Sequence, residues 1–354
     1  MNLKSNQNTD SIKTVSIEFL SVYPLIQSWR LTKNLVSSTL IFTFLVYLPI
    51  SLIFAKKEFS PLGAKDVTIP SFGPKGEINW TLSAKEVTPL DGESTYIVKK
   101  PSLKMISKGN SISNATSDEG TFNLGNSTAH GQTLLEVSGD GFIAKGDSWV
   151  WKQQAKEGIH QMELRSNTYV YFQSEIEPIL PSKKEVAGKV ETKMVKVANT
   201  TAMAEVIELI TRDEGGYLFV LDGNVSVKGD SLEIFCSRMD VVVENDSNQS
   251  EMSFGRITEV NATGNVRMNQ LGRVCTADVL ILDTIEGKGL LLGNAKVEDV
   301  EWGAVSGEKV ELDKNGGRAR VIGTGKIKPR LELPNFGKIN LPGFRNSPKK
   351  TLKP

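Results

Sequence analysis

The sequence predicts an all-β protein that follows a single N-terminal transmembrane helix. Residues 35–55 contain no charged side chain, and an apolar run of about 20 residues is what a helix needs to cross a bilayer. From residue 80 onward, short runs of β-branched and aromatic residues are separated by Gly, Asn and Asp, which is typical of strands joined by tight turns. A phrase built on Gly-Asn recurs three times within residues 221–323, which indicates stacked copies of one supersecondary unit.

The composition excludes several classes of function. Forty-two Lys and Arg residues against 41 Asp and Glu residues give a net charge of +1, so there is no electrostatic case for a nucleic-acid partner. Two cysteines and two histidines are too few for a disulfide scaffold or a zinc site. We therefore expect no metal and no cofactor.

The N-terminal part reads as an anchor with flanking segments. Residues 1–34 are predicted to be a short cytoplasmic lead, residues 35–55 the transmembrane helix, and residues 56–79, which are rich in Pro and Gly, a spacer. A cleavable signal peptide would have a shorter apolar core and an A-x-A exit, so we expect the anchor to be retained. The charges that flank the span do not settle its orientation, but long domains are translocated largely regardless of such charges, and we place the rest of the chain outside the cytoplasm.

Two β domains and a tail are predicted after the spacer. Residues 80–172 alternate strand-like runs with turns at the spacing of a sandwich or jelly roll. Residues 173–201 are rich in lysine and contain two prolines, which is typical of an interdomain linker. Residues 202–325 form the second β domain, and residues 326–354 a basic, proline-rich tail whose prolines exclude a central strand.

The repeated phrase defines the second domain. Its copies begin at Gly223, Gly264 and Gly293, and each Gly-Asn is followed by an alternating apolar pair. A second strand-like run comes after each copy, at residues 240–244, 278–283 and 308–313. The unit is therefore predicted to be a pair of β-strands.

Alternation in these strands places apolar side chains on one face. A sheet that no helix covers must bury this face on another sheet or leave a groove for an apolar ligand. The candidate groove residues are Val225, Val227, Val241, Val243, Val266, Met268, Val279, Ile281, Ala295 and Val297.

Two other features were weighed for chemistry. Cys236 and Cys275 occupy comparable places in the first two repeats, so both a disulfide and two buried thiols remain open. Residues 229–232 read Gly-Asp-Ser-Leu, the signature around the nucleophile of a lipase and esterase family, but no histidine follows residue 160. A serine without a base is not activated, so we expect a turn at this place and no enzymatic activity.

The chain resembles the proteins of lipopolysaccharide export. Trp80-Thr-Leu-Ser-Ala after a single anchor, with residues 116–120 (TSDEG) and Trp149-Val-Trp downstream, is similar to the LptC family. The three Gly-Asn phrases between residues 217 and 323 are similar to the LptA (OstA-like) domain. Two departures are that one chain joins both modules, and that Lys309 and Glu311 stand where the third repeat calls for apolar side chains.

The resemblance implies a fold and a function. It implies two V-shaped β-jelly rolls whose apolar interior carries the acyl chains of lipopolysaccharide, with edge strands that add onto other OstA-like proteins. The partners implied are lipopolysaccharide, an inner-membrane ABC transporter complex and the membrane itself. The chain would be a single-pass inner-membrane protein with its bulk in the periplasm. Two other classes stay open: a FecR-like transmembrane signalling protein, and a structural β scaffold at the cell surface.

Overall fold

The computed structural model describes residues 63–90, 94–107, 112–154, 158–180, 199–244, 255–300, 303–323 and 328–333. The predicted lead, the predicted transmembrane helix and most of the predicted tail lie outside these residues. The described residues contain no helix that is both long enough and apolar enough to span a membrane.

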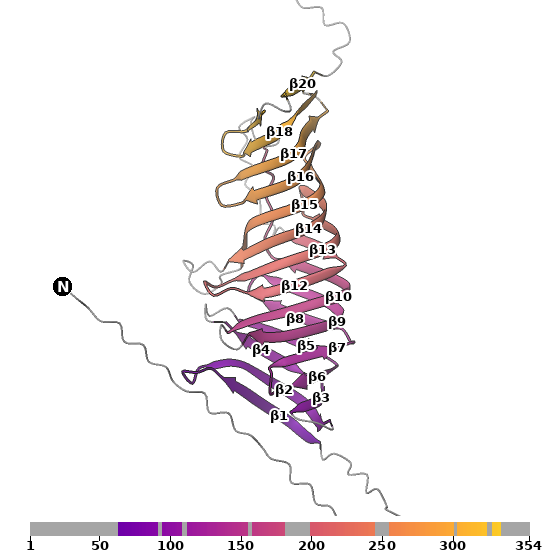
Figure 1. Ribbon diagram of the computed structural model, residues 1–354, viewed down its shortest axis with the longest axis vertical. Coiled ribbons are helices and arrows are strands. Elements are labelled where there is room, and N and C mark those ends of the chain that lie inside the picture. Colours follow the sequence, from indigo (N-terminus) through magenta and orange to yellow (C-terminus); the bar gives the residue numbers. More distant parts are fainter. Residues whose placement is uncertain are drawn as a thin grey trace, which may run out of the picture. The chain divides into compact units, whose positions relative to one another are not determined.

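The described residues form one antiparallel sheet of twenty strands (Figure 1). Its first half contains β1 (Ala64–Phe72), β2 (Ile78–Pro89), β3 (Thr95–Lys99), β4 (Ser102–Ile106), β5 (Ile112–Ser117), β6 (Glu119–Asn123), β7 (Thr128–Gly131), β8 (Leu135–Gly139), β9 (Phe142–Gln154) and β10 (Ile159–Phe172). The second half contains β11 (Thr200–Ala204), β12 (Val206–Thr211), β13 (Tyr217–Lys228), β14 (Leu232–Glu244), β15 (Arg256–Gln270), β16 (Arg273–Asp283), β17 (Lys288–Asp299), β18 (Gly303–Asp313), β19 (Arg318–Ile322) and β20 (Arg330–Glu332). The predicted all-β class is therefore confirmed for this part of the chain.

The long strands divide between two walls. Residues 86–89 of β2 pair with β3, whereas residues 80–83 pair with β4. In the same way β9 pairs with β7 and β8 through different halves, and β10 and β13 each pair with β12 and β11 through different halves. We call the side with β3, β6, β7, β12 and β19 the first wall, and the side with β4, β5, β8, β11 and β20 the second wall.

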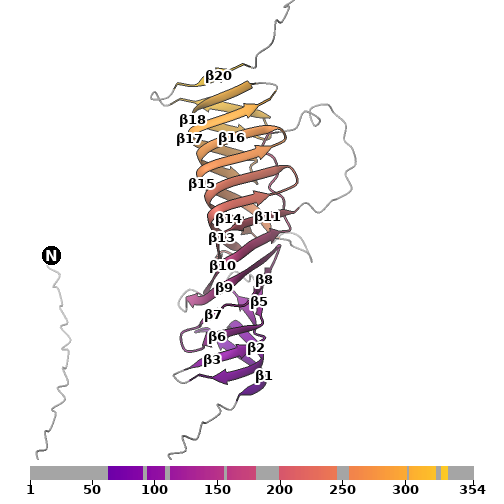
Figure 2. The ribbon, with the colours of Figure 1, turned by 90° about the vertical axis from the view of Figure 1, so that its right-hand side faces the viewer.

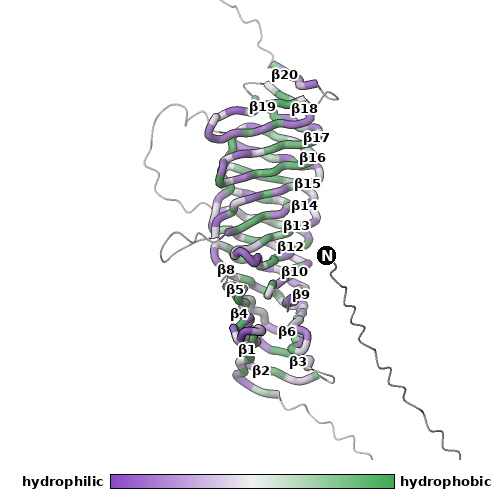
Figure 3. Tube along the Cα trace, turned by 60° about the vertical axis from the view of Figure 1, so that its left-hand side comes forward, coloured by the Kyte–Doolittle hydropathy of each residue, from purple (hydrophilic) through white to green (hydrophobic). Residues whose placement is uncertain are grey.

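The two walls face each other across a shared core. Trp80 in the second wall meets Trp151 in the first with ring centroids 5.7 Å apart. Phe142 and Phe172 also lie in the second wall, and their ring centroids are 4.9 and 5.0 Å from that of Phe219 in the first wall. Figures 2 and 3 show the stacked strands from two further directions, and the colours of Figure 3 show hydrophobic and hydrophilic residues interspersed along them. The core is one hydrophobic cluster that runs from β2 to β18.

Each Gly-Asn phrase lies at the bend between the walls, inside a continuous strand. The register of β13, β15 and β17 shifts at residues 222–225, 263–266 and 292–295. The glycines have φ of 78, 82 and 69°, and the asparagines that follow have φ of 48, 50 and 47°. Gly and Asn tolerate this left-handed region better than other residues, so the phrase is a strand-bending bulge.

Residues that precede each phrase in the chain complete these corners. The Nδ2 of Asn224 donates to Glu205, and the Nδ2 of Asn294 donates to Oδ2 of Asp278 at 3.2 Å. At the middle corner the hydroxyl of Ser237 donates to the carbonyl of Gly264 at 3.3 Å. A Cβ added at any of the three glycines would collide with Glu205, Ser237 or Asp278, so the close approach also requires glycine.

Two predicted connections are part of the folded sheet. β1 lies within the predicted spacer 56–79 and pairs along its length with β2. The predicted linker 173–201 has its last residues in β11, and Ile176, Ile179 and Leu180 are buried in the core. The spacer and linker predictions were wrong for these residues, because proline and lysine content describes a segment's own propensity and not the surface it packs on.

Candidate functional site

The candidate site is the apolar interior between the walls. Inward side chains from the first wall include Phe219, Val241, Ile257, Leu280, Leu291 and Val310, all at most 1% exposed. Those from the second wall include Val227, Ile234, Val266, Met268, Cys275 and Ala295, all at most 2% exposed. The inner faces of both walls are thus apolar, and they are in contact with each other in this structure.

Eight of the ten predicted groove residues point into this interior. Val225, Val227, Val241, Val243, Val266, Met268, Ala295 and Val297 are buried in the shared core. The prediction was wrong for Val279 and Ile281, which are half-exposed on the outer face of β16. The register of β16 shifts between Thr276 and Val279, so Leu280 and Leu282 take the inward places instead. Strict alternation read from the sequence misses such a shift.

The third repeat follows the same rule despite its charged residues. Lys309 and Glu311 lie on the outer face of β18, where Nζ and Oε1 are 2.9 Å apart. Val310 and Leu312 are the inward residues, at 0 and 1% exposure. The departure from the resemblance therefore falls on the outside of the wall and leaves the interior apolar.

The interior carries no ionised side chain among the described buried residues. The buried polar side chains there belong to Ser, Thr, Gln and His. Burial lowers the pKa of His160 to about 4, so this imidazole is neutral at pH 7. Burial raises the pKa of Cys236 to about 11 and that of Cys275 to about 12, so both thiols are neutral as well. An uncharged apolar interior suits an alkyl chain and does not suit an ionic ligand.

The two cysteines are not bridged. Both are free and buried. Cys236 lies on β14 and Cys275 on β16, with β15 between them. Strands two apart in a sheet are separated by about 9.5 Å, whereas a disulfide requires Cα atoms within about 7 Å. The disulfide that the sequence left open is therefore not formed, and the alternative of two buried thiols describes the structure.

We call the side of the interior opposite the bend, where the free ends of the two walls face each other, the mouth. In the N-terminal half, hydrogen bonds between the walls close this mouth directly. The indole Nε1 of Trp80 donates to Oε1 of Gln153 at 2.9 Å, and Nε2 of His160 lies 3.3 Å from the carbonyl oxygen of Ile106. At the junction of the two halves, the hydroxyl of Tyr217 in β13 donates to the carbonyl of Ile112 in β5 at 2.9 Å. Each of these bonds joins the first wall to the second, so this part of the interior is closed by the walls themselves.

In the C-terminal half the mouth is covered by residues 173–180, which we call the strap. Its Ser174 Oγ accepts from the amide of Ile257 in the first wall at 3.4 Å. The amide of Ile179 donates to Oε1 of Gln270 in the second wall at 3.1 Å. Glu177 forms an ion pair with Lys314 in the turn between β18 and β19. The strap thus alternates between the two walls along the mouth.

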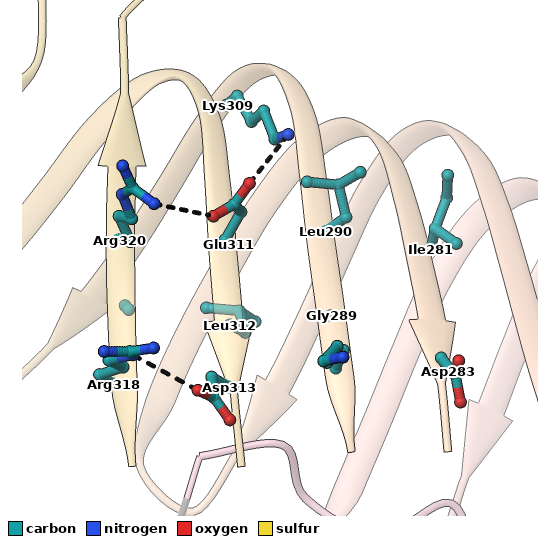
Figure 4. Close-up of a pocket in the computed structure, with 12 residues that line it drawn as sticks. Ile281, Asp283, Gly289, Leu290, Lys309, Glu311, Leu312, Asp313, Arg318 and Arg320 are labelled. Atoms are coloured by element: carbon teal, nitrogen blue, oxygen red, sulfur yellow. Dashed lines mark ion pairs between the residues drawn. The ribbon is translucent and has the colours of Figure 1, made fainter. Parts of the chain in front are cut away.

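A cleft of about 730 Å³ lies outside this interior, on the outer face of β16–β19 (Figure 4). Ile281 and Leu290 contribute apolar surface to it. Glu311 in this cleft forms an ion pair with Lys309, and its Oε2 lies 4.0 Å from Nη1 of Arg320. Because these charges are neutralised within the cleft, its chemistry points to no particular ligand.

The remaining sequence candidate is the Gly-Asp-Ser-Leu stretch. It forms the turn between β13 and β14, where the amide of Gly229 donates to the carbonyl of Leu232 at 2.8 Å. The turn prediction is confirmed.

Among the described residues no group of His, Cys, Asp and Glu could hold a metal ion. Comparison with protein-family models and with curated proteins gave no match for this sequence.

Proposed function

We propose that this protein is a membrane-anchored lipid carrier of lipopolysaccharide export, which holds acyl chains in the apolar interior between its walls. The observation that supports this best is the interior itself, an uncharged core lined by aliphatic side chains over the whole series from β2 to β18. Together with the resemblance to the LptC and OstA-like families, it favours a carrier with two β-jelly-roll modules, anchored by residues 35–55 in the inner membrane and facing the periplasm.

The physical reason is the cost of exposing an acyl chain. Each CH₂ group is worth about 0.8 kcal/mol on transfer from water to an apolar site, so a fourteen-carbon chain costs on the order of 10 kcal/mol to expose. A few surface hydrogen bonds cannot offset this cost. A carrier therefore needs an interior whose inner faces are apolar along their length, and the walls must separate to admit the chain.

The ends of the sheet suit assembly with similar proteins. β1 pairs with β2, and β19 pairs with β18 over residues 309–313. The outer edges of these two strands carry backbone groups that can pair with another strand. We propose that other OstA-like proteins add at these edges and that an inner-membrane ABC transporter supplies the work.

Photo-crosslinking to lipopolysaccharide tests the carrier function. A photoreactive amino acid at Val266 or Leu280 points into the interior, whereas one at Val279, the neighbour of Leu280, points outward and is the matched control. We expect crosslinks from the two inward positions and about tenfold fewer from Val279. Equal yields from inward and outward positions, or none from any of them, would overturn the proposal.

A structural β scaffold is the second candidate. The contact between the walls and the bonds that close the N-terminal mouth favour it, because a scaffold needs a filled, dry interior. It predicts that no inward position ever crosslinks to lipid, so the same experiment separates the two candidates.

A further inference from the structure

The strap fills the place where an acyl chain would enter the C-terminal interior. Ile176 and Ile179 are each 1% exposed and Leu180 is 5% exposed, although the segment forms no strand. These side chains belong to the same hydrophobic cluster as Val266 and Leu280. Three aliphatic side chains buried in one apolar cluster offer the same surface chemistry as an alkyl chain.

The strap is held by contacts that can be exchanged. The amides of Ile176 and Ile179 donate to side chains, the Thr200 hydroxyl at 3.3 Å and Gln270 at 3.1 Å, and not to a strand. The ion pair of Glu177 and Lys314 is solvent-exposed, and such pairs contribute little to stability. The strap can therefore leave the mouth without breaking any strand pairing of the sheet.

Gln270 supplies a second, independent observation. It is 2% exposed, its Oε1 accepts from the strap, and its Nε2 is buried without a hydrogen-bond partner. A buried donor without a partner is costly and marks a place that a ligand can satisfy. The carbonyl oxygen of an ester-linked or amide-linked acyl chain is an acceptor of the required kind.

We infer that the strap is an internal occupant of an acyl site at the C-terminal mouth, and that lipid loading displaces it. This inference rests on the proposed carrier function. The acyl chain takes the places of Ile176, Ile179 and Leu180, and its head carbonyl accepts from Nε2 of Gln270. The lipid-free protein must first release the strap. The apparent association constant for lipid is therefore the intrinsic constant multiplied by the fraction of molecules in which the mouth is open.

Weakening the strap is the first test. In the full chain, the double substitution Ile176→Ser and Ile179→Ser removes two of the three buried aliphatic side chains of the strap and leaves the sequence of the walls unchanged. Binding of fluorescent lipid A, followed by anisotropy, is expected to tighten by about tenfold. Ile285→Ser, at a residue 57% exposed in the turn after β16, is the matched control and should bind as the unaltered chain does.

Locking the strap is the reciprocal test, and it does not depend on destabilising substitutions. Glu177→Cys with Lys314→Cys places two thiols at the ion pair, where a short bis-maleimide can join strap to wall. The native thiols are buried, and Glu177→Cys alone, treated in the same way, is the control. The bridged protein is expected to bind lipid A about tenfold more weakly than this control or worse.

The outcomes separate the inference from the function on which it rests. If lipid A binds the unaltered chain, and the weakened and bridged variants bind it with unchanged affinity, the inference that lipid displaces the strap is overturned and the carrier function stands. If no variant binds lipid A and no inward position crosslinks, the carrier function itself fails. Hydrogen exchange at the amides of Ile176 and Ile179 gives a further readout: faster exchange on adding lipid A supports displacement, and unchanged exchange with bound lipid contradicts it.

Discussion

The two halves of the sheet close the same interior in different ways. In the N-terminal half the long strands β2, β9 and β10 alternate with pairs of short strands, one in each wall, and Trp80 and His160 bond directly across the mouth. In the C-terminal half long strands run through both walls, bend at Gly-Asn corners, and are covered by the strap. If the walls separate to admit lipid, as we propose, direct bonds between them must break in the first half, whereas the mouth of the second half is covered by a segment outside the strand pairing. The proposal therefore predicts that opening begins in the C-terminal half.

The largest expected effect concerns the aromatic closure of the N-terminal half. Trp151 is 1% exposed, contacts Trp80, and stacks on His160 with ring centroids 6.1 Å apart. Trp151→Ala should lower the free energy of unfolding by about 3–5 kcal/mol, measured by urea denaturation. Met203→Ala, at a residue 56% exposed, should change it by less than about 0.5 kcal/mol. A small loss at Trp151 would mean that this half is not held as tightly as its contacts indicate.

A pH dependence of similar size is expected from His160. Burial lowers its pKa from 6.5 to about 4, so between these values the unfolded chain binds a proton that the folded chain does not. The contribution is fully present above pH 6.5 and is lost as pH falls toward 4, by about 3 kcal/mol.

The measurement compares urea denaturation of the unaltered chain and His160→Gln at pH 7, 5 and 4. Carboxylates titrate in both proteins, so their effect cancels in the difference. The unaltered chain should lose more stability than the variant on acidification. Parallel losses would show that His160 is not held neutral at the mouth.

The smallest effect is expected at a Gly-Asn corner of the C-terminal half. Asn294 has φ of 47°, and its side chain donates to Asp278. Asn294→Ala removes this bond and leaves at a left-handed φ a residue that tolerates it less well than asparagine, so it should cost about 1–2 kcal/mol. Asn294→Gly should cost less than the alanine, because glycine adopts this φ freely. Equal losses for both variants, in urea denaturation, would mean that the hydrogen bond alone matters at the corner.

The Gly-Asn phrases illustrate how far the sequence could be read. Their repetition predicts stacked β units, and the alternation after each phrase predicts the inward side chains of β13, β15 and β17. The sequence does not reveal that the phrase lies within a strand, since Gly-Asn is equally suited to a turn between strands. It also does not reveal the shift in β16 that exchanges Ile281 for Leu280, because no glycine marks it.

The β class and the apolar alternation could be predicted from the residues alone, because they depend on each residue and its nearest neighbours. The tertiary structure decided which wall each half-strand joins, how the mouth is closed, and that the segment of Ile176 and Ile179 packs into the core instead of linking two domains. These features depend on which distant surface lies opposite a segment. A proline-containing, polar-looking stretch is buried when an unfilled apolar trough lies beside it, and its own residues do not record that trough.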